Sequence, residues 1–162
     1  MFFYVHTLVY MLYYIYQQPK ERNTMKIYHH TKDVHLDSIK ADGVIKLEGS
    51  NLEQMFIDAR GFGPAADQWK MCKMQYDLVG RYVWFTEESQ SKSTTMIIDM
   101  PTTAIGFDTD NVQVKRWYDV GRELMKKGGI TKKIVRALNE TAKQSGDDPS
   151  KWWVSTQAVD LP

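Results

Sequence analysis

The order of strand-like and helix-like segments constrains this chain more than any other feature of its sequence. The two kinds of pattern are intermixed from residue 26 to residue 159. They lack the regular β-α-β rhythm that a doubly wound parallel sheet requires. We therefore predict an α+β fold.

Six segments have the composition or the alternation of strands. The segment Tyr82 to Thr86 is rich in the β-branched and aromatic residues that strands favour. Apolar and small residues alternate from Trp152 to Val159, a pattern suited to a terminal strand. We predict strands at residues 26–30, 44–47, 82–86, 96–100, 104–108 and 152–159.

Three segments have the start and stop signals of helices. Asp33 is a suitable N-cap for a helix that ends at Gly43, and Thr131 is a suitable N-cap for one that ends at Gly146. Between them, apolar residues recur at helical spacing from Trp117 to Leu124. The stretch from residue 48 to 77 shows no such regularity and contains the turn-forming segment 61–64, so we predict a loop with short helices there.

A chain of 162 residues is long enough for about one domain. Residues 25–162 read as ordinary folded protein, whereas residues 1–24 form an apolar, tyrosine-rich extension. The fifteen residues Phe2–Tyr16 would reach roughly 22 Å as a helix, too short for a bilayer core. They also lack the flanks of a secretory signal. We expect no transmembrane span, and the extension is a spurious upstream start, a packing helix or a peripheral anchor.

The cysteine content and the charge bear on location and partners. A single cysteine, Cys72, cannot form an internal disulfide, so we expect a cytoplasmic protein. The formal net charge is only +1, but residues 115–143 carry a local net charge of +6. This segment is either a binding face for a nucleic acid or an acidic protein, or a solvated pair of helices. Its basic residues are Lys115, Arg116, Arg122, Lys126, Lys127, Lys132, Lys133, Arg136 and Lys143.

Common catalytic motifs are missing from the sequence. It has no phosphate-binding GxxxxGK[ST], GxGxxG, HExxH or GxSxG pattern. Three histidines, His29, His30 and His35, lie close together, but neighbours in a strand point to opposite faces. We therefore predict no metal site.

Two segments taken together indicate a function. The first is Ile27-Tyr28-His29-His30-Thr31, which leads through a helix to Asp42-Gly43-Val44-Ile45. The second is Val83-Trp84-Phe85-Thr86-Glu87, followed closely by Ser91-Lys92-Ser93. In content and order they resemble the diphtheria-toxin and poly-ADP-ribose-polymerase-like branch of the ADP-ribosyltransferase superfamily, which includes bacterial DNA-targeting members. The resemblance covers mainly residues 26–46 and 82–94.

The resemblance implies a single ADP-ribosyltransferase-like domain, with a split antiparallel sheet and flanking helices. It implies NAD as the substrate and a protein or nucleic acid as the acceptor of ADP-ribose. By the same resemblance, His29 holds the NAD ribose, with Thr31 and the main chain of His30 nearby. Trp84 and Phe85 supply the aromatic strand, and Ser91 or Ser93 lies near the nicotinamide amide.

The late strand departs from the family pattern. Active members carry a glutamate there, whereas this chain offers Gln157. An amide can hydrogen-bond a ribose hydroxyl but cannot act as a base. A displaced carboxylate from Glu87, Glu88 or Asp160 is one possibility. Two other readings stay open: an inactive binding module or inhibitor with the same fold, and a small nucleic-acid-binding protein that acts through its basic helices.

Overall fold

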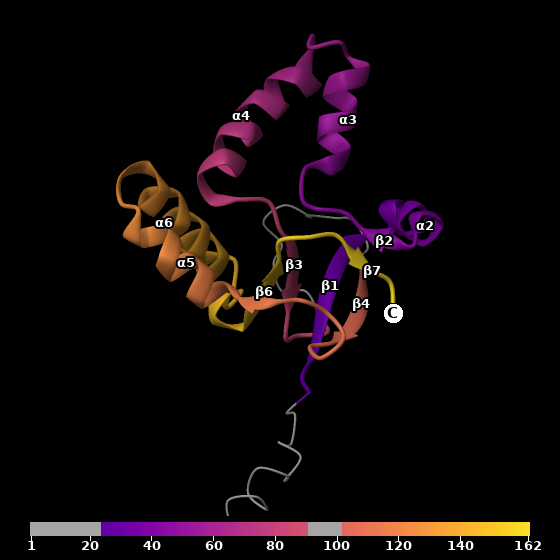
Figure 1. Ribbon diagram of the computed structural model, residues 1–162, viewed down its shortest axis with the longest axis vertical. Helices are drawn as coiled ribbons and strands as arrows, with labels where there is room; N and C mark the ends of the chain where they lie inside the picture. Colours follow the sequence, from indigo (N-terminus) through magenta and orange to yellow (C-terminus); the bar gives the residue numbers. More distant parts are fainter. Residues whose placement is uncertain (1–23, 91–101) are drawn as a thin grey trace, which may run out of the picture.

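The structure is a computed structural model, and it describes residues 24–90 and 102–162. These residues form two antiparallel sheets and five α-helices, which confirms the α+β class (Figure 1). The strands are β1 (Lys26–Lys32), β2 (Val44–Ile45), β3 (Val83–Thr86), β4 (Thr102–Asp108), β5 (Lys115–Arg116), β6 (Trp152–Ser155) and β7 (Val159–Asp160). The helices are α2 (Asp33–Asp42), α3 (Ser50–Asp58), α4 (Pro64–Val79), α5 (Trp117–Lys126) and α6 (Gly129–Gln144), with a short 3-10 helix, η1, at Pro149–Lys151.

The larger sheet has the strand order β4-β1-β3-β6-β5, and β2 pairs with β7 in a separate ribbon. Strand β1 pairs with β4 along its whole length, from Lys26↔Asp108 to Lys32↔Thr102. On its other side β1 pairs with β3 only at Tyr28↔Thr86. The centre of the sheet is therefore partly split between β1 and β3.

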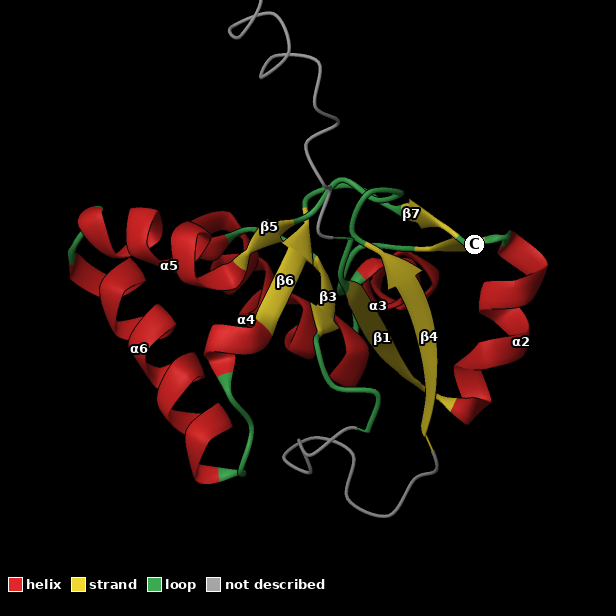
Figure 2. Ribbon diagram, turned by 90° about the horizontal axis from the view of Figure 1, so that it is seen from below, coloured by secondary structure: helices red, strands yellow, loops and turns green. Residues whose placement is uncertain are grey.

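Helices flank the larger sheet on both sides. Figure 2 shows α2 beside β4 at one side and the α5–α6 pair beside β6 and β5 at the other. Helices α3 and α4 form a hairpin that projects from the end of the sheet near β2 and β3 (Figure 1). The hairpin is fastened through Arg81, whose guanidinium pairs with Glu53 at 2.8 Å and stacks 4.6 Å from the Trp69 ring.

Successive side chains of β3 enter two different hydrophobic cores. Val83 and Phe85 point into one core, which also contains Ile27. Trp84 points the other way and packs against a second core that contains Trp117, which is 1 % exposed. Successive strand residues face opposite sides, so one short strand contributes to both cores, and burial of each large side chain stabilises the fold by about 1.5–3 kcal/mol.

The prediction for residues 48–77 was wrong, because most of this stretch is helical. Helix α4 alone has 16 residues and buries Ala66, Trp69 and Val79. These positions fall on one face of a helix. Exposed methionines between them, such as Met71 and Met74, obscured the periodicity in the sequence. The expected turn at 61–64 is confirmed, since it joins α3 to α4.

Two predicted helix caps were also wrong. Lys32 occupies the N-cap of α2, and Asp33 is the first helical residue, where its carboxylate accepts a hydrogen bond from Thr103 (2.7 Å). Helix α6 begins at Gly129 after Gly128, and Thr131 is buried inside its first turn. The glycine pair therefore lies between the end of α5 at Lys126 and the second residue of α6.

The predicted strand 152–159 is interrupted. Strand β6 ends at Ser155, and the chain resumes as β7 at Val159. The Ser155 hydroxyl donates to the carbonyl of Gln157 (2.9 Å), which closes a turn between the two strands. The strand predicted at 96–100 lies outside the described residues, as do residues 1–23. Among the described helices, none has the length and apolarity needed to cross a membrane.

Candidate functional site

A cavity of about 580 Å³ lies beside the split in the sheet. It is lined by residues of β1 and β3, the end of α4, the inner face of α6 and the start of β6. Its wall includes the aromatic side chains of Tyr28, Trp84 and Trp152. The volume falls within the range of about 300–1,000 Å³ that is usual for small-molecule sites.

A second cavity, of about 320 Å³, lies between α2 and the segment that leads from β2 into α3. Three residues line both cavities: His29, Lys46 and Glu48. The two cavities therefore adjoin at these three residues, of which Lys46 pairs with Asp42 at 2.7 Å. We refer to them as the larger and the smaller cavity.

His29 occupies the split between β1 and β3. Its Nδ1 lies 2.9 Å from the main-chain oxygen of Trp84. A carbonyl oxygen can only accept, so Nδ1 carries the proton and Nε2 offers a lone pair in the neutral ring. Burial lowers the pKa of His29, the hydrogen bond to Trp84 opposes this shift, and nearby His30 adds to it. At neutral pH the ring is therefore an uncharged hydrogen-bond acceptor at Nε2.

Trp84 connects His29 to Glu48. Its main-chain oxygen accepts from His29, and its indole Nε1 donates to Glu48 Oε2 at 2.9 Å. The indole itself packs against Trp117, with ring centroids 4.8 Å apart. A single well-packed residue thus fixes both the imidazole and the carboxylate.

The charge of Glu48 also reaches a neighbouring phenol. Burial raises the pKa of Tyr76 to about 12, and the negative charge of Glu48 contributes to the rise. Tyr76 is therefore an uncharged phenol at neutral pH. Its ring lies against that of Trp69, at a centroid distance of 6.2 Å. The sequence analysis did not identify Glu48 as a site residue. It stands in the stretch 48–77, which we predicted as a loop with short helices.

Most of the residues singled out in the two sequence blocks gather at the cavities. His30 lines the larger cavity, and its Nε2 lies 2.9 Å from the main-chain oxygen of Glu88. Thr31 is buried and lines the smaller cavity. Phe85 lines the larger cavity, and its ring meets that of His29 edge-on at 6.0 Å. Ser91 and Ser93 lie outside the described residues.

Gln157 lies apart from this group. It is exposed in the turn between β6 and β7, and its side-chain amide donates to Gln113 at 3.0 Å. It lines neither cavity. Asp160 follows on β7 and is also exposed. The late strand therefore brings no acidic side chain to either cavity.

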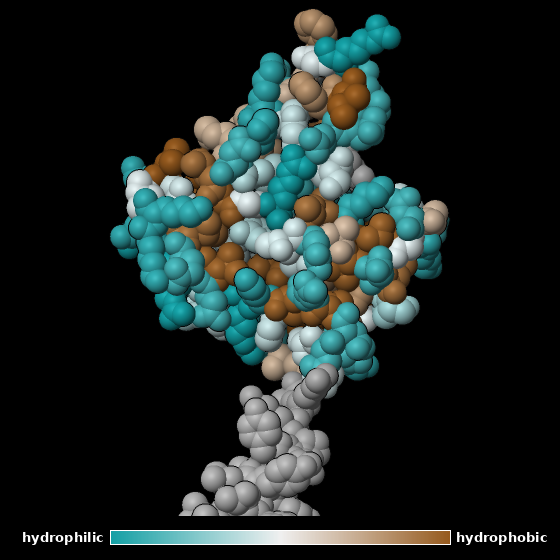
Figure 3. Space-filling view, viewed as in Figure 1, coloured by the Kyte–Doolittle hydropathy of each residue, from teal (hydrophilic) through white to brown (hydrophobic). Residues whose placement is uncertain are grey.

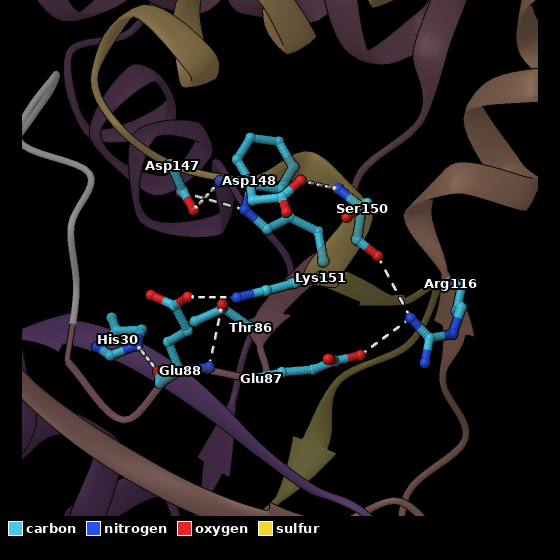
Figure 4. Close-up of polar contacts among 10 residues, drawn as sticks. His30, Thr86, Glu87, Glu88, Arg116, Asp147, Asp148, Ser150 and Lys151 are labelled. Atoms are coloured by element: carbon cyan, nitrogen blue, oxygen red, sulfur yellow. Dashed lines mark hydrogen bonds and ion pairs between the residues drawn. The ribbon is translucent and has the colours of Figure 1, made fainter.

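The two glutamates after β3 are held in ion pairs (Figure 4). Glu87 pairs with Arg116 at 2.9 Å, and its carboxylate also accepts from the indole of Trp153. Glu88 lines the larger cavity and pairs with Lys151 at 2.7 Å, which raises the pKa of that lysine. The two ion pairs fasten the end of β3 to β5 and η1, and the hydrogen bond from Trp153 fastens it to β6. Glu48, by contrast, lies directly beside the Trp84–His29 pair.

The described residues contain no group of three or more histidine, cysteine or acidic side chains that could hold a metal ion. Comparison of the chain with family models, with curated proteins and with solved structures gave no match.

Proposed function

We propose that this protein is an NAD-dependent ADP-ribosyltransferase that breaks the bond between nicotinamide and ribose and passes ADP-ribose to a macromolecule. The observation that supports this proposal best is the pair of His29 and Glu48, which Trp84 holds at the junction of two cavities. The resemblance of residues 26–46 and 82–94 to the superfamily adds the identity of the substrate.

The chemistry needs three things from the site. Cleavage of the nicotinamide–ribose bond develops positive charge on the sugar, as glycoside cleavage does. His29 Nε2 would accept a hydrogen bond from a ribose hydroxyl and fix the orientation of the sugar. The aromatic wall around Trp84 would hold the nicotinamide ring, and the carboxylate of Glu48 would stabilise the developing cation.

The acceptor and the cellular location belong to the same proposal. The basic segment 115–143 supplies positive charge that would attract an acidic partner, and Figure 3 shows hydrophilic side chains over much of α5 and α6. Lys133, Arg136 and Lys143 are exposed on α6. We place the activity in the cytoplasm, in keeping with the single cysteine.

One observation favours a second candidate function. Gln157 stands where active members of the superfamily carry a glutamate, and it lies on an exposed turn outside both cavities. If Glu48 does not serve in its place, the protein would be an inactive module that binds NAD or a partner without cleaving it.

The direct test is nicotinamide release from NAD by the purified full chain, alone and with cell lysate. We expect His29→Ala to lower release at least about tenfold, because the sugar loses its orienting acceptor. His29→Asn should keep the hydrogen bond to Trp84 through its amide yet lose the Nε2 acceptor, so it separates folding from activity. Val34→Ala is the control, since Val34 is exposed on α2 and lines neither cavity.

Release that is equal in wild type and His29→Asn would refute the role of the imidazole. If NAD binds but no nicotinamide appears with any acceptor, the enzyme proposal fails and the binding module takes its place.

A further inference from the structure

Strand β4 forms an open edge of the larger sheet. It stands first in the strand order, and it pairs only with β1. The amide of Thr109 donates to the carbonyl of Met25 (3.0 Å), so the hydrogen-bonded pairs between the two strands fall on odd-numbered residues. The main-chain groups of Thr102, Ala104 and Gly106 therefore point away from β1. Within the described residues, no main-chain group pairs with them.

This edge has none of the features by which proteins usually protect the edge of a sheet. Charged side chains, prolines and bulges normally keep another strand from pairing there. The first six residues of β4 include no charged residue and no proline. The register with β1 runs without a bulge from Lys26↔Asp108 to Lys32↔Thr102, and Gly106 is exposed. The edge can therefore accept a further strand.

Helix α2 lies beside the same edge (Figure 2). The hydroxyl of Thr103 on β4 donates to Asp33 at 2.7 Å, which places the first turn of α2 next to the edge strand. No residue of α2 is buried, and Val34 is 68 % exposed. A surface helix normally buries an apolar face. A strand with apolar side chains, added beside β4, would offer α2 a surface on which to pack.

The chain itself carries a segment with the composition of such a strand. Residues 1–23 lie outside the described part of the structure. Of the fifteen residues 2–16, eleven are aromatic or β-branched, the types that strands favour. None of the fifteen is charged, and none is glycine or proline. A run of this kind tends to aggregate when it is left in water, and pairing with a sheet edge would remove that hazard.

The described chain begins at the end of β4, within reach of the open edge. The hydroxyl of Thr24 donates to Asp110 at 2.7 Å, and the amide of Met25 donates to the hydroxyl of Thr109 at 3.1 Å. A strand added outside β4 would lie two strand spacings from β1, or about 10 Å. The seven residues 17–23 can span up to about 25 Å. Because the chain enters β1 at the end where β4 finishes, the added strand would run parallel to β4.

We propose that the β4 edge is a docking site for the chain's own N-terminal segment, and that part of residues 2–16 adds a sixth strand to the larger sheet. Main-chain hydrogen bonds to Thr102, Ala104 and Gly106 hold this strand, as in other cases of strand addition. A second copy of the chain competes poorly for the edge, because a tethered segment has an effective concentration on the order of millimolar. The inference is independent of the proposed function.

Hydrogen exchange at the amides of Ala104 and Gly106, measured by NMR on the full chain, tests the proposal. The disrupting variant combines Val5→Pro, Tyr10→Pro and Ile15→Pro, so that any seven consecutive residues within 2–16 contain a proline. We expect both amides to exchange at least about tenfold faster in this variant than in wild type. The matched control replaces the same three residues with threonine, which keeps every main-chain donor and a β-branched side chain, and it should retain the protection.

The amide of Ile105 is the internal reference, because it pairs with His29 of β1 and should stay protected in all three chains if the sheet is intact. Light scattering on the wild-type chain should give the mass of one copy. Equal exchange of the Ala104 and Gly106 amides in wild type and the proline variant would overturn the proposal. Protection that comes with the mass of a dimer would also overturn it and would assign the edge to a second copy.

Discussion

Two glycines with similar backbone angles should respond very differently to alanine. Gly43 has φ +68 and Gly49 has φ +81, a left-handed conformation that costs other residues about 1–2 kcal/mol. An added Cβ at Gly43 would meet nothing within 4 Å. At Gly49 the Cβ would lie 2.6 Å from Cε2 of Tyr76. Gly49 stands next to Glu48, so the difference reports on packing beside the candidate site.

The Tyr76 ring cannot move away freely. It packs on Trp69, and the Arg81 guanidinium lies 5.1 Å from its centroid. Forcing extra volume into a packed region typically costs about 1–3 kcal/mol. We therefore expect Gly43→Ala to lower the free energy of unfolding by about 1–2 kcal/mol, and Gly49→Ala by about 2–5 kcal/mol when strain and overpacking add.

Urea denaturation measures both costs from the shift in midpoint, provided that the slope with denaturant stays constant. The Tyr76→Ala background separates the two contributions, because Gly49→Ala should then cost only the backbone strain, about 1–2 kcal/mol. Equal losses from Gly43→Ala and Gly49→Ala in the wild-type background would refute the placement of Tyr76 against Gly49.

Two further predictions concern the residues at the cavity junction. Because burial lowers the folded pKa of His29 below 6.5, the unfolded state binds a proton first as the pH falls. The contribution of neutral His29 to the free energy of unfolding should be fully present above about pH 6.5 and should decline as the pH falls toward the pKa of His29 in the folded state. Urea denaturation from pH 8 to pH 5 should therefore show a weaker dependence of stability on pH for His29→Asn than for wild type. Trp84→Phe removes the indole donor to Glu48 and should lower nicotinamide release about tenfold, since the carboxylate loses its anchor. Trp153→Phe is the matched control, because its indole donates to Glu87 and it lines neither cavity; equal effects of the two substitutions would contradict the role of Glu48.

The sequence was informative wherever a pattern is local. The β-branched and aromatic composition of residues 82–86 predicted the strand that is β3. The spacing of Trp117, Val120 and Leu124 predicted the helix that is α5, because residues three and four apart share one helix face. Helix α4 was not predicted because exposed methionines make its solvent-facing side almost as apolar as its buried side. The interruption of the terminal strand after Ser155 was not predicted, because the turn is closed by a hydrogen bond from the Ser155 side chain and contains no glycine or proline.

The candidate site depends on contacts that no local pattern encodes. His29 meets Trp84 across 55 residues of chain, and Trp84 meets Glu48 across 36. The first contact joins the two segments that the sequence analysis singled out together, although no pattern in either segment predicts that contact. The second depends on where the connection from β2 to α3 passes the sheet, which is set by the hairpin that the sequence did not predict.

The split between β1 and β3 links the fold to the proposed chemistry. A main-chain carbonyl shielded from water must find a donor, and the half-buried carbonyl of Trp84 finds one in the His29 imidazole. The two strands can therefore separate beyond Tyr28↔Thr86 without leaving that carbonyl unpaired, and His29 comes to line both cavities. The same hydrogen bond fixes the tautomer and leaves Nε2 as an acceptor. One interaction thus bridges the split and orients the ring, and since both partners stand on strands, the position of His29 follows from the fold.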